Sequence, residues 1–164
     1  MKKLSFLLAI ILLLSTCFMA ACKKDDKPKD DTPETTIASI SVGQLKNYEI
    51  IYARNSSKEI PNYGVVELFK AINEIFGVTL NQRTDLYYEG VDSLKKGQYE
   101  ILIGHTNREE SETFLANMKW DDYGYGIVGD KLVIAGKNED GTVKAVRAFL
   151  EYLAAYEKSD VFFS

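Results

Sequence analysis

Cysteine and histidine are almost absent from this sequence. Its 164 residues include 2 cysteines, Cys17 and Cys22, both near the N-terminus, and 1 histidine, His105. Beyond Cys22 there can be no disulfide framework, no zinc–cysteine site and no cysteine nucleophile. A Gly-x-Ser-x-Gly nucleophile elbow is also lacking, so a serine triad around the single histidine has little support. We therefore expect no metal, no cofactor and no catalytic residue.

A surplus of positive charge is lacking as well. The formal net charge is −4 at pH 7, and it becomes −6 if Lys2 and Lys3 are removed with an N-terminal leader. Proteins that bind nucleic acid present clustered basic side chains to the phosphates. This mildly acidic chain does not provide such a surface, and we expect no nucleic-acid partner.

The N-terminus has the pattern of an export signal. Two lysines precede an 18-residue, mostly apolar run at positions 4–21, which ends in small residues directly before Cys22. The run Met19-Ala-Ala-Cys22 resembles the lipobox of bacterial lipoproteins, although that family usually has leucine where Met19 stands. The resemblance implies that the Cys22 thiol receives a lipid and becomes the new N-terminus. Two acyl chains, palmitate among them, would suffice for stable membrane attachment.

Three alternatives to lipidation at Cys22 remain open, and one of them is ordinary secretion without a lipid. Cys17 is a second acceptor, although Thr16 before it fits less well, and an 18-residue apolar run is just long enough for an uncleaved membrane anchor. Lipidation at Cys22 and an uncleaved membrane anchor would both hold the protein at the extracytoplasmic face of the cell membrane. We expect a signal peptide at 1–21, a flexible linker at 22–40 and a single domain at 41–164, because residues 23–37 are charged and lack aromatic side chains.

Apolar periodicity predicts the elements of the domain. Strands are expected at residues 48–53, 78–81, 86–88 and 100–104, a hairpin at 125–135 around Gly129-Asp130, and an edge segment at 161–163. Helices are expected after Asn62 up to Gly77, after a Thr106–Glu109 capping box, and from Gly141-Thr142 onward. This order predicts an α+β two-layer sandwich with a mixed, mostly antiparallel sheet and helices mainly on one face.

Three stretches of the chain resemble a known accessory domain. They are residues 48–53, the run Ile-Leu-Ile-Gly-His-Thr-Asn-Arg-Glu-Glu-Ser at 101–111, and residues 123–136 continuing to 145–150. They resemble the β-hexosaminidase domain-2-like family, the small α/β domain that precedes the catalytic barrel of β-hexosaminidases and α-glucuronidases. The resemblance covers residues 48–156 and implies a non-catalytic domain, because the family's catalytic carboxylates lie in the barrel.

The resemblance leaves three ways for this domain to act. The sequence reaches Ser164 where the family's barrel would begin. The domain could work alone, dock on a separate glycoside hydrolase, or be the N-terminal fragment of a larger one. We expect a glycan- or protein-binding module, with a scaffold lipoprotein unrelated to carbohydrate as the alternative and a small hydrolase ranked last.

Six side chains are the candidate ligand contacts: Trp120, Tyr123, Tyr125, His105, Asn107 and Arg108. The three aromatic rings could stack on sugars, although aromatics in strands more often pack across strands. The histidine follows a buried strand, where open α/β sheets often bind ligands, but loop backbone could equally satisfy it. The Asn-Arg pair fits a staple between loops better than a ligand clamp.

Two motifs that suggest chemistry have simpler explanations. Glu109-Glu110 and Asp121-Asp122 are adjacent acids, and neighbours in sequence point in divergent directions, which is the wrong geometry for glycoside hydrolysis. Residues 136–142 mimic a phosphate-binding loop but lack its lysine, so a turn and a helix cap are favoured.

Overall fold

The computed structural model describes residues 39–86, 96–156 and 160–164, all within one compact unit, Glu34–Ser164. The expected signal peptide, Cys22, nearly all of the expected linker and two residues of the strand expected at 86–88 lie outside the described residues. The linker was expected to reach residue 40, but Ile40 is fully buried in a strand. The folded part of the chain therefore begins before residue 41.

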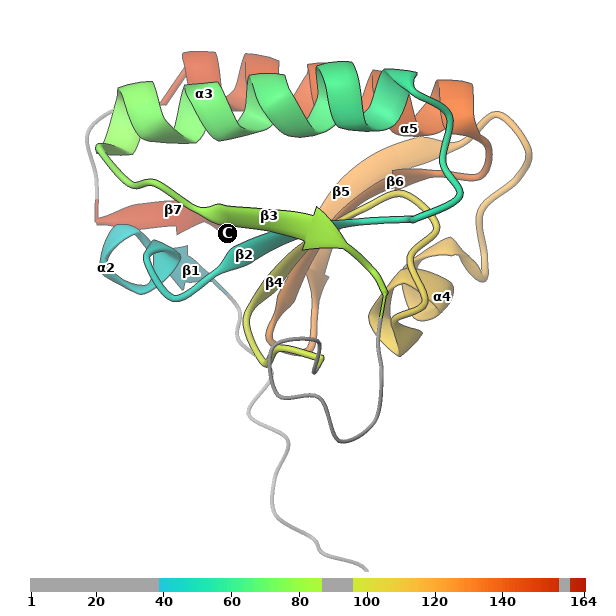
Figure 1. Ribbon diagram of the computed structural model, residues 1–164, viewed down its shortest axis with the longest axis horizontal. Helices are drawn as coiled ribbons and strands as arrows, with labels where there is room; N and C mark the ends of the chain where they lie inside the picture. The colour runs from blue at the N-terminus through green and yellow to red at the C-terminus, as the bar shows by residue number, and fades with distance from the viewer. Residues whose placement is uncertain (1–38, 87–95, 157–159) are drawn as a thin grey trace, which may run out of the picture. The chain divides into compact units, whose positions relative to one another are not determined.

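A five-stranded mixed sheet forms the centre of the domain (Figure 1), with the strand order β3-β2-β4-β6-β5. Its strands are β2 (Glu49–Tyr52), β3 (Asn81–Thr84), β4 (Glu100–Ile103), β5 (Tyr123–Val128) and β6 (Lys131–Gly136). A separate antiparallel pair joins β1 (Ile40–Ser41) to β7 (Val161–Phe163), near the ends of the described chain. The expected edge segment at 161–163 is thus confirmed as a strand.

The prediction of a mostly antiparallel sheet is wrong for the five-stranded sheet. The β3–β2, β2–β4 and β4–β6 pairs are parallel, and β5–β6 is antiparallel. The hairpin provides a short connection, which makes its two strands antiparallel, whereas the helix between β2 and β3 returns the chain across the sheet. The unbroken apolar pattern of β4, buried at all four residues, is the pattern typical of a parallel strand covered on both faces.

Helices cover the sheet unequally, as the sequence predicts. The helical segments are α2 (Val42–Leu45), η1 (Ile60–Val65), α3 (Val66–Phe76), α4 (Glu109–Leu115) and α5 (Glu139–Ala154). Helices α3 and α5 run side by side over one face, and the short α4 lies on the other (Figure 1). Most of the buried apolar side chains, including Leu68, Ile72 and Phe149, lie on the α3–α5 face. The two-layer α+β architecture is therefore confirmed.

Three of the expected helix and turn signals can be checked directly. Gly77 ends α3 with φ 68°, and Gly129 turns the hairpin with φ 59°, as expected. The prediction of a capping box with Thr106 as the N-cap residue is wrong. Arg108 is the N-cap residue of α4 and makes no side-chain cap, and the Thr106 hydroxyl pairs with Ser111 Oγ at 2.7 Å.

Helix α5 begins two residues earlier than expected, at Glu139, where Asn138 provides the cap. Within the described part of the chain, no helix is long and apolar enough to cross a membrane.

The connections that follow the neighbouring parallel strands β2 and β4 lead to opposite faces of the sheet. The connection that leaves β2 enters α3 on one face, and the connection that leaves β4 leads to α4 on the other face. In open α/β sheets, ligands bind in the crevice that such a divergence creates beyond the carboxyl ends of the strands. The topology therefore directs attention to the segments that follow Tyr52, Ile103 and Gly136.

Candidate functional site at the carboxyl edge of the sheet

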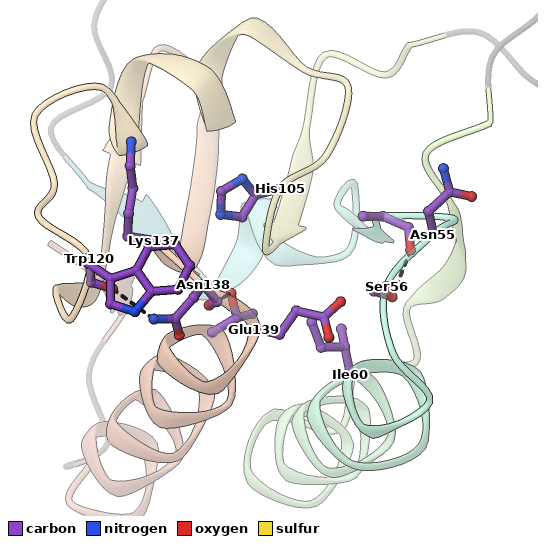
Figure 2. Close-up of a pocket in the computed structure, with 10 residues that line it drawn as sticks. Asn55, Ser56, Ile60, His105, Trp120, Lys137, Asn138 and Glu139 are labelled. Atoms are coloured by element: carbon purple, nitrogen blue, oxygen red, sulfur yellow. Dashed lines mark hydrogen bonds between the residues drawn. The ribbon is translucent and has the colours of Figure 1, made fainter.

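A cavity of about 430 Å³ lies where the segments after β2, β4 and β6 meet (Figure 2). Its volume is within the range of small-molecule sites. We call it the Trp120 cavity. The described residues that line it are Ala53, Asn55, Ser56, Ile60, His105, Trp120, Lys137, Asn138, Glu139 and Thr142.

The indole of Trp120 is the most exposed large apolar side chain among the described residues, with an exposed fraction of 71 %. It is also the only tryptophan of the chain. Its loop is fastened to the end of β6 by two hydrogen bonds: Asn138 Nδ2 donates to Trp120 O at 2.8 Å, and Lys137 N donates to Asp122 O at 2.9 Å. The ring is thus presented to solvent on an anchored backbone, as a stacking surface requires.

Asn138 links this loop to the start of α5. Its Oδ1 accepts a hydrogen bond from Gly141 N at 2.7 Å, which caps the helix, while its Nδ2 holds Trp120 O. The turn before α5 is very tight, because a Cβ added to Gly136 would lie 2.2 Å from the Gly141 carbonyl carbon. Only glycine fits at this position, and the expectation of a turn with a helix cap is confirmed here.

His105 lies at the rim of the cavity because of the backbone before it. Gly104 adopts φ 77°, which turns the chain sharply after β4. The His105 Nε2 atom lies 3.0 Å from Gly136 O. Since a carbonyl oxygen only accepts hydrogen bonds, Nε2 is the donor in this contact, and the contact leaves Nδ1 facing away from Gly136 O for other partners.

Lys137 and Glu139 bring one charge of each sign to the cavity. Lys137 Nζ donates to Leu115 O at 3.0 Å, and Glu139 Oε1 accepts from Ser57 N at 2.8 Å. Glu139 is the single carboxylate among the described lining residues. Glycoside hydrolysis requires two carboxyl groups across a cleft, so this lining supplies one of the two.

A second cavity, of about 370 Å³, adjoins the first. His105 and Lys137 line both cavities and separate them. We call it the α4 cavity, because its remaining described lining residues lie on α4 and next to its ends: Thr106, Ser111, Glu112, Leu115 and Ala116.

The six predicted contact residues separate into four groups, of which Asn107 and Arg108 form the last. Trp120 and His105 line the Trp120 cavity, as a contact role requires. Tyr123 is 47 % exposed at the start of β5 but is not part of the lining. Tyr125 is half-buried and packs against the core, with its ring centroid 5.0 Å from that of Phe149 on α5, so its ring packs between the sheet and the helix.

Asn107 and Arg108 form a structural staple rather than a ligand clamp. Asn107 donates from its backbone N and its Nδ2 to Asp85, at 2.9 and 2.8 Å. Arg108 is fully buried and forms an ion pair with Glu100, its Nε lying 2.9 Å from Oε2. Their polar groups are therefore engaged within the protein, in agreement with the staple interpretation.

Glu100 is the centre of a buried charge network. Besides Arg108, Lys131 Nζ lies 3.1 Å from its carboxylate, and Lys131 also contacts Glu110 at 3.0 Å. Burial alone would raise the pKa of Glu100, but the hydrogen bonds from Arg108 and Gly97 N and the nearby positive charges outweigh it and hold the pKa below its ordinary value of 4.5. The sequence signal for this network was a glutamate opening an otherwise apolar strand.

The adjacent acids lie outside both cavity linings. Glu110 is part of the ion-pair network, and Asp122 Oδ2 accepts from Lys119 N at 2.8 Å, which closes the turn around Trp120. Within the described ranges, no group of three histidine, cysteine or acidic side chains is placed to hold a metal ion.

Sequence reasoning missed five of the polar lining residues: Asn55, Ser56, Lys137, Asn138 and Glu139. All five follow the carboxyl end of β2 or of β6. They could be expected to lie close together only if β2, β4 and β6 were known to run in the same direction.

No protein-family model and no curated protein sequence matches this chain. The resemblance to the β-hexosaminidase domain-2-like family therefore stays a prediction, and the site has to be judged by its own geometry.

Proposed function

We propose that this chain is a lipid-anchored, extracytoplasmic protein whose domain binds glycans without cleaving them. The observation that carries the proposal is the exposed indole of Trp120 at the rim of a cavity lined with hydrogen-bonding side chains. A pyranose ring presents C–H groups on its faces and hydroxyl groups at its edge. An exposed aromatic face beside polar groups complements both parts of such a ring.

The polar lining suits the edge of a sugar. Asn55 offers an amide with donors and an acceptor, His105 offers the ring nitrogen Nδ1, and Glu139 has a second carboxylate oxygen. Donors and acceptors of mixed kind are what hydroxyl groups require, since each hydroxyl both donates and accepts. The cavity also lies at the edge of the sheet where α/β folds most often bind ligands.

Binding without turnover is favoured by the charges of the lining. Glu139 is its single carboxylate among the described residues, and that group already accepts a hydrogen bond from Ser57 N. An inverting or retaining glycosidase places two carboxyl groups on either side of the scissile bond. Glycan attachment at a membrane surface therefore fits the site better than hydrolysis.

The anchor is proposed from the N-terminal sequence. The apolar run, the small residues and Cys22 together support lipidation, and residues 23–37 have the composition of a spacer. We expect Cys22→Ala to abolish incorporation of a palmitate analogue and to release the protein from the membrane fraction. Cys17→Ala is the matched control, and the proposal fails if that change, rather than Cys22→Ala, prevents labelling.

Glycan binding is tested by calorimetric titration of the full-length protein in a detergent that contains no sugar. The probes are uncharged gluco-, manno-, xylo- and N-acetylglucosamine oligomers of one to three units. We expect at least one series to bind and Trp120→Ala to weaken it at least tenfold, as loss of a central aromatic contact does. Tyr123→Ala is the matched control, because Tyr123 is an exposed aromatic outside the lining.

Two results would contradict the glycan proposal. One is the absence of binding across the whole panel. The other is equal weakening by Trp120→Ala and Tyr123→Ala, which would mean that neither side chain belongs to a defined site. Shortening of any oligomer during the titration, detected by mass spectrometry, would show turnover and overturn the non-catalytic part of the proposal.

A further inference from the structure

The Trp120 cavity and the α4 cavity share one wall. His105 and Lys137 line both, and Figure 2 shows the Lys137 side chain extending away from α5. Both side chains are tied to backbone carbonyls, His105 to Gly136 O and Lys137 to Leu115 O, each at 3.0 Å. The two side chains at the boundary between the cavities are therefore held in place. A ligand long enough to fill both cavities would pass along His105 and Lys137.

The two cavities offer different chemistry. The Trp120 cavity has an aromatic face, whereas the described lining of the α4 cavity contains no aromatic ring. In the α4 cavity, the Thr106 and Ser111 hydroxyls are buried and bond to each other at 2.7 Å, so the exposed Glu112 carboxylate provides the acceptor for a ligand. The first cavity suits stacking and the second suits hydrogen bonding, which are complementary demands of neighbouring sugar units.

The charged side chains around the two cavities are negative on balance. Lys137 lies between Glu139 in one lining and Glu112 in the other. Uronate or sulfate groups are bound by clustered cations with bidentate geometry, and the described linings contain no arginine. Asp140, in the first turn of α5, adds a further negative charge near the first cavity. These charges favour an uncharged ligand.

We infer that the two cavities form one groove that holds at least two consecutive units of an uncharged oligosaccharide. One unit stacks on Trp120, the next lies against Thr106 and Glu112, and the linkage between them passes His105 and Lys137. The inference rests on the proposed glycan-binding function and adds to it a ligand length and a ligand charge.

The test is the dependence of affinity on chain length, measured by calorimetry on the full-length protein. We expect the disaccharide of the responding series to bind at least tenfold more tightly than its monosaccharide. Ala116→Phe fills the α4 cavity and should bring this ratio to about one with monosaccharide affinity unchanged. Asn117→Phe is the matched control, since it places the same ring on the neighbouring residue outside both linings.

A second variant guards against an accidental contact by the new ring. Glu112→Ala removes a hydrogen-bond acceptor without filling the cavity, and it should lower the disaccharide-to-monosaccharide ratio about tenfold. The charge part is tested with the matching uronate oligomers, which should bind at least tenfold more weakly than the uncharged ones.

The outcomes separate the two proposals. If monosaccharides bind through Trp120 but chain length has no effect, or if both α4-cavity variants keep the wild-type ratio, the groove is wrong and the glycan site stands. If the uronate oligomers bind as tightly as the uncharged ones, the inferred ligand charge is wrong. If no sugar of any length binds, both proposals fall.

Discussion

Asn138 performs two roles with the two ends of one amide, and a single substitution separates them. Its Oδ1 caps α5 through Gly141 N, and its Nδ2 anchors the carbonyl of Trp120. Asn138→Asp keeps an oxygen for the cap, and its charge at the helix N-terminus gains about 0.3–1 kcal/mol. The lost bond to Trp120 costs about 1 kcal/mol. The free energy of unfolding should therefore change by less than about 1 kcal/mol, whereas Asn138→Ala, which removes both bonds, should cost roughly 1.5–3 kcal/mol.

The mobility of Trp120 tests this reasoning without knowledge of the ligand. Because the chain has a single tryptophan, its fluorescence anisotropy and acrylamide quenching report on this loop alone. We expect Asn138→Asp and Asn138→Ala to lower the anisotropy and increase the quenching equally, while urea unfolding separates their stabilities. Asn55→Asp is the control, because it adds the same charge to the same lining without a bond to Trp120. Wild-type Trp120 mobility in Asn138→Asp, or an equal change in Asn55→Asp, would refute the anchoring role.

Three further predictions concern the fold that supports the site. Gly136→Ala should destabilise the domain by at least about 3 kcal/mol in urea unfolding, because its Cβ would overlap the α5 backbone. The control Gly124→Ala has open space around its Cβ and should stay within about 1 kcal/mol of wild type. Equal effects of the two substitutions would contradict the close approach of Gly136 to α5. Glu100→Gln should cost about 3–5 kcal/mol at pH 7 by leaving the buried Arg108 without its charged partner. Because the folded pKa of Glu100 lies below its unfolded value of 4.5, the wild type should lose this stability as the pH falls through the folded pKa, and the variant should lack that part of the acid transition. Burial of the Tyr48 side chain, and after it the nearby charge of Asp130, raise the pKa of Tyr48 to about 12. Absorbance at 295 nm should therefore show one tyrosine ionising near that pH, and the free energy of unfolding should decline as the pH rises above 10. Tyr48→Phe should remove both effects.

Much of the fold could be predicted from periodicity because its elements are locally consistent. The stripe that includes Ile72 predicted α3, and the Gly129-Asp130 turn predicted the hairpin. The pairing directions could not be predicted in this way: the apolar run of β4 indicates a strand covered on both faces, but it does not show that β2 and β6 are its neighbours. The capping box predicted for α4 is wrong because the Thr106 hydroxyl bonds to the Ser111 hydroxyl, five residues along the chain, and not to a backbone amide of the helix.

The candidate site was only partly predictable. Trp120 and His105 could be proposed because each is rare in this sequence and each adjoins a strand. Arg108 was proposed because it follows the buried strand β4 closely in sequence. Its role depends on an ion pair with Glu100, which forms because the chain after β4 brings Arg108 back to that carboxylate. Asn138 and Glu139 resembled an ordinary helix start, and only the parallel arrangement of β2, β4 and β6 places them beside His105.

The most direct test of the glycan site is a nuclear magnetic resonance titration of the full-length protein, labelled with ¹⁵N, in a detergent without sugar. The single indole N–H signal of Trp120 is followed together with the backbone amides as uncharged disaccharides are added. We predict saturable shifts of the indole signal and of the amides of His105, Lys137 and Glu139, all with one dissociation constant. An indole signal that stays fixed while the disaccharide binds elsewhere, or while no disaccharide binds, would contradict the account.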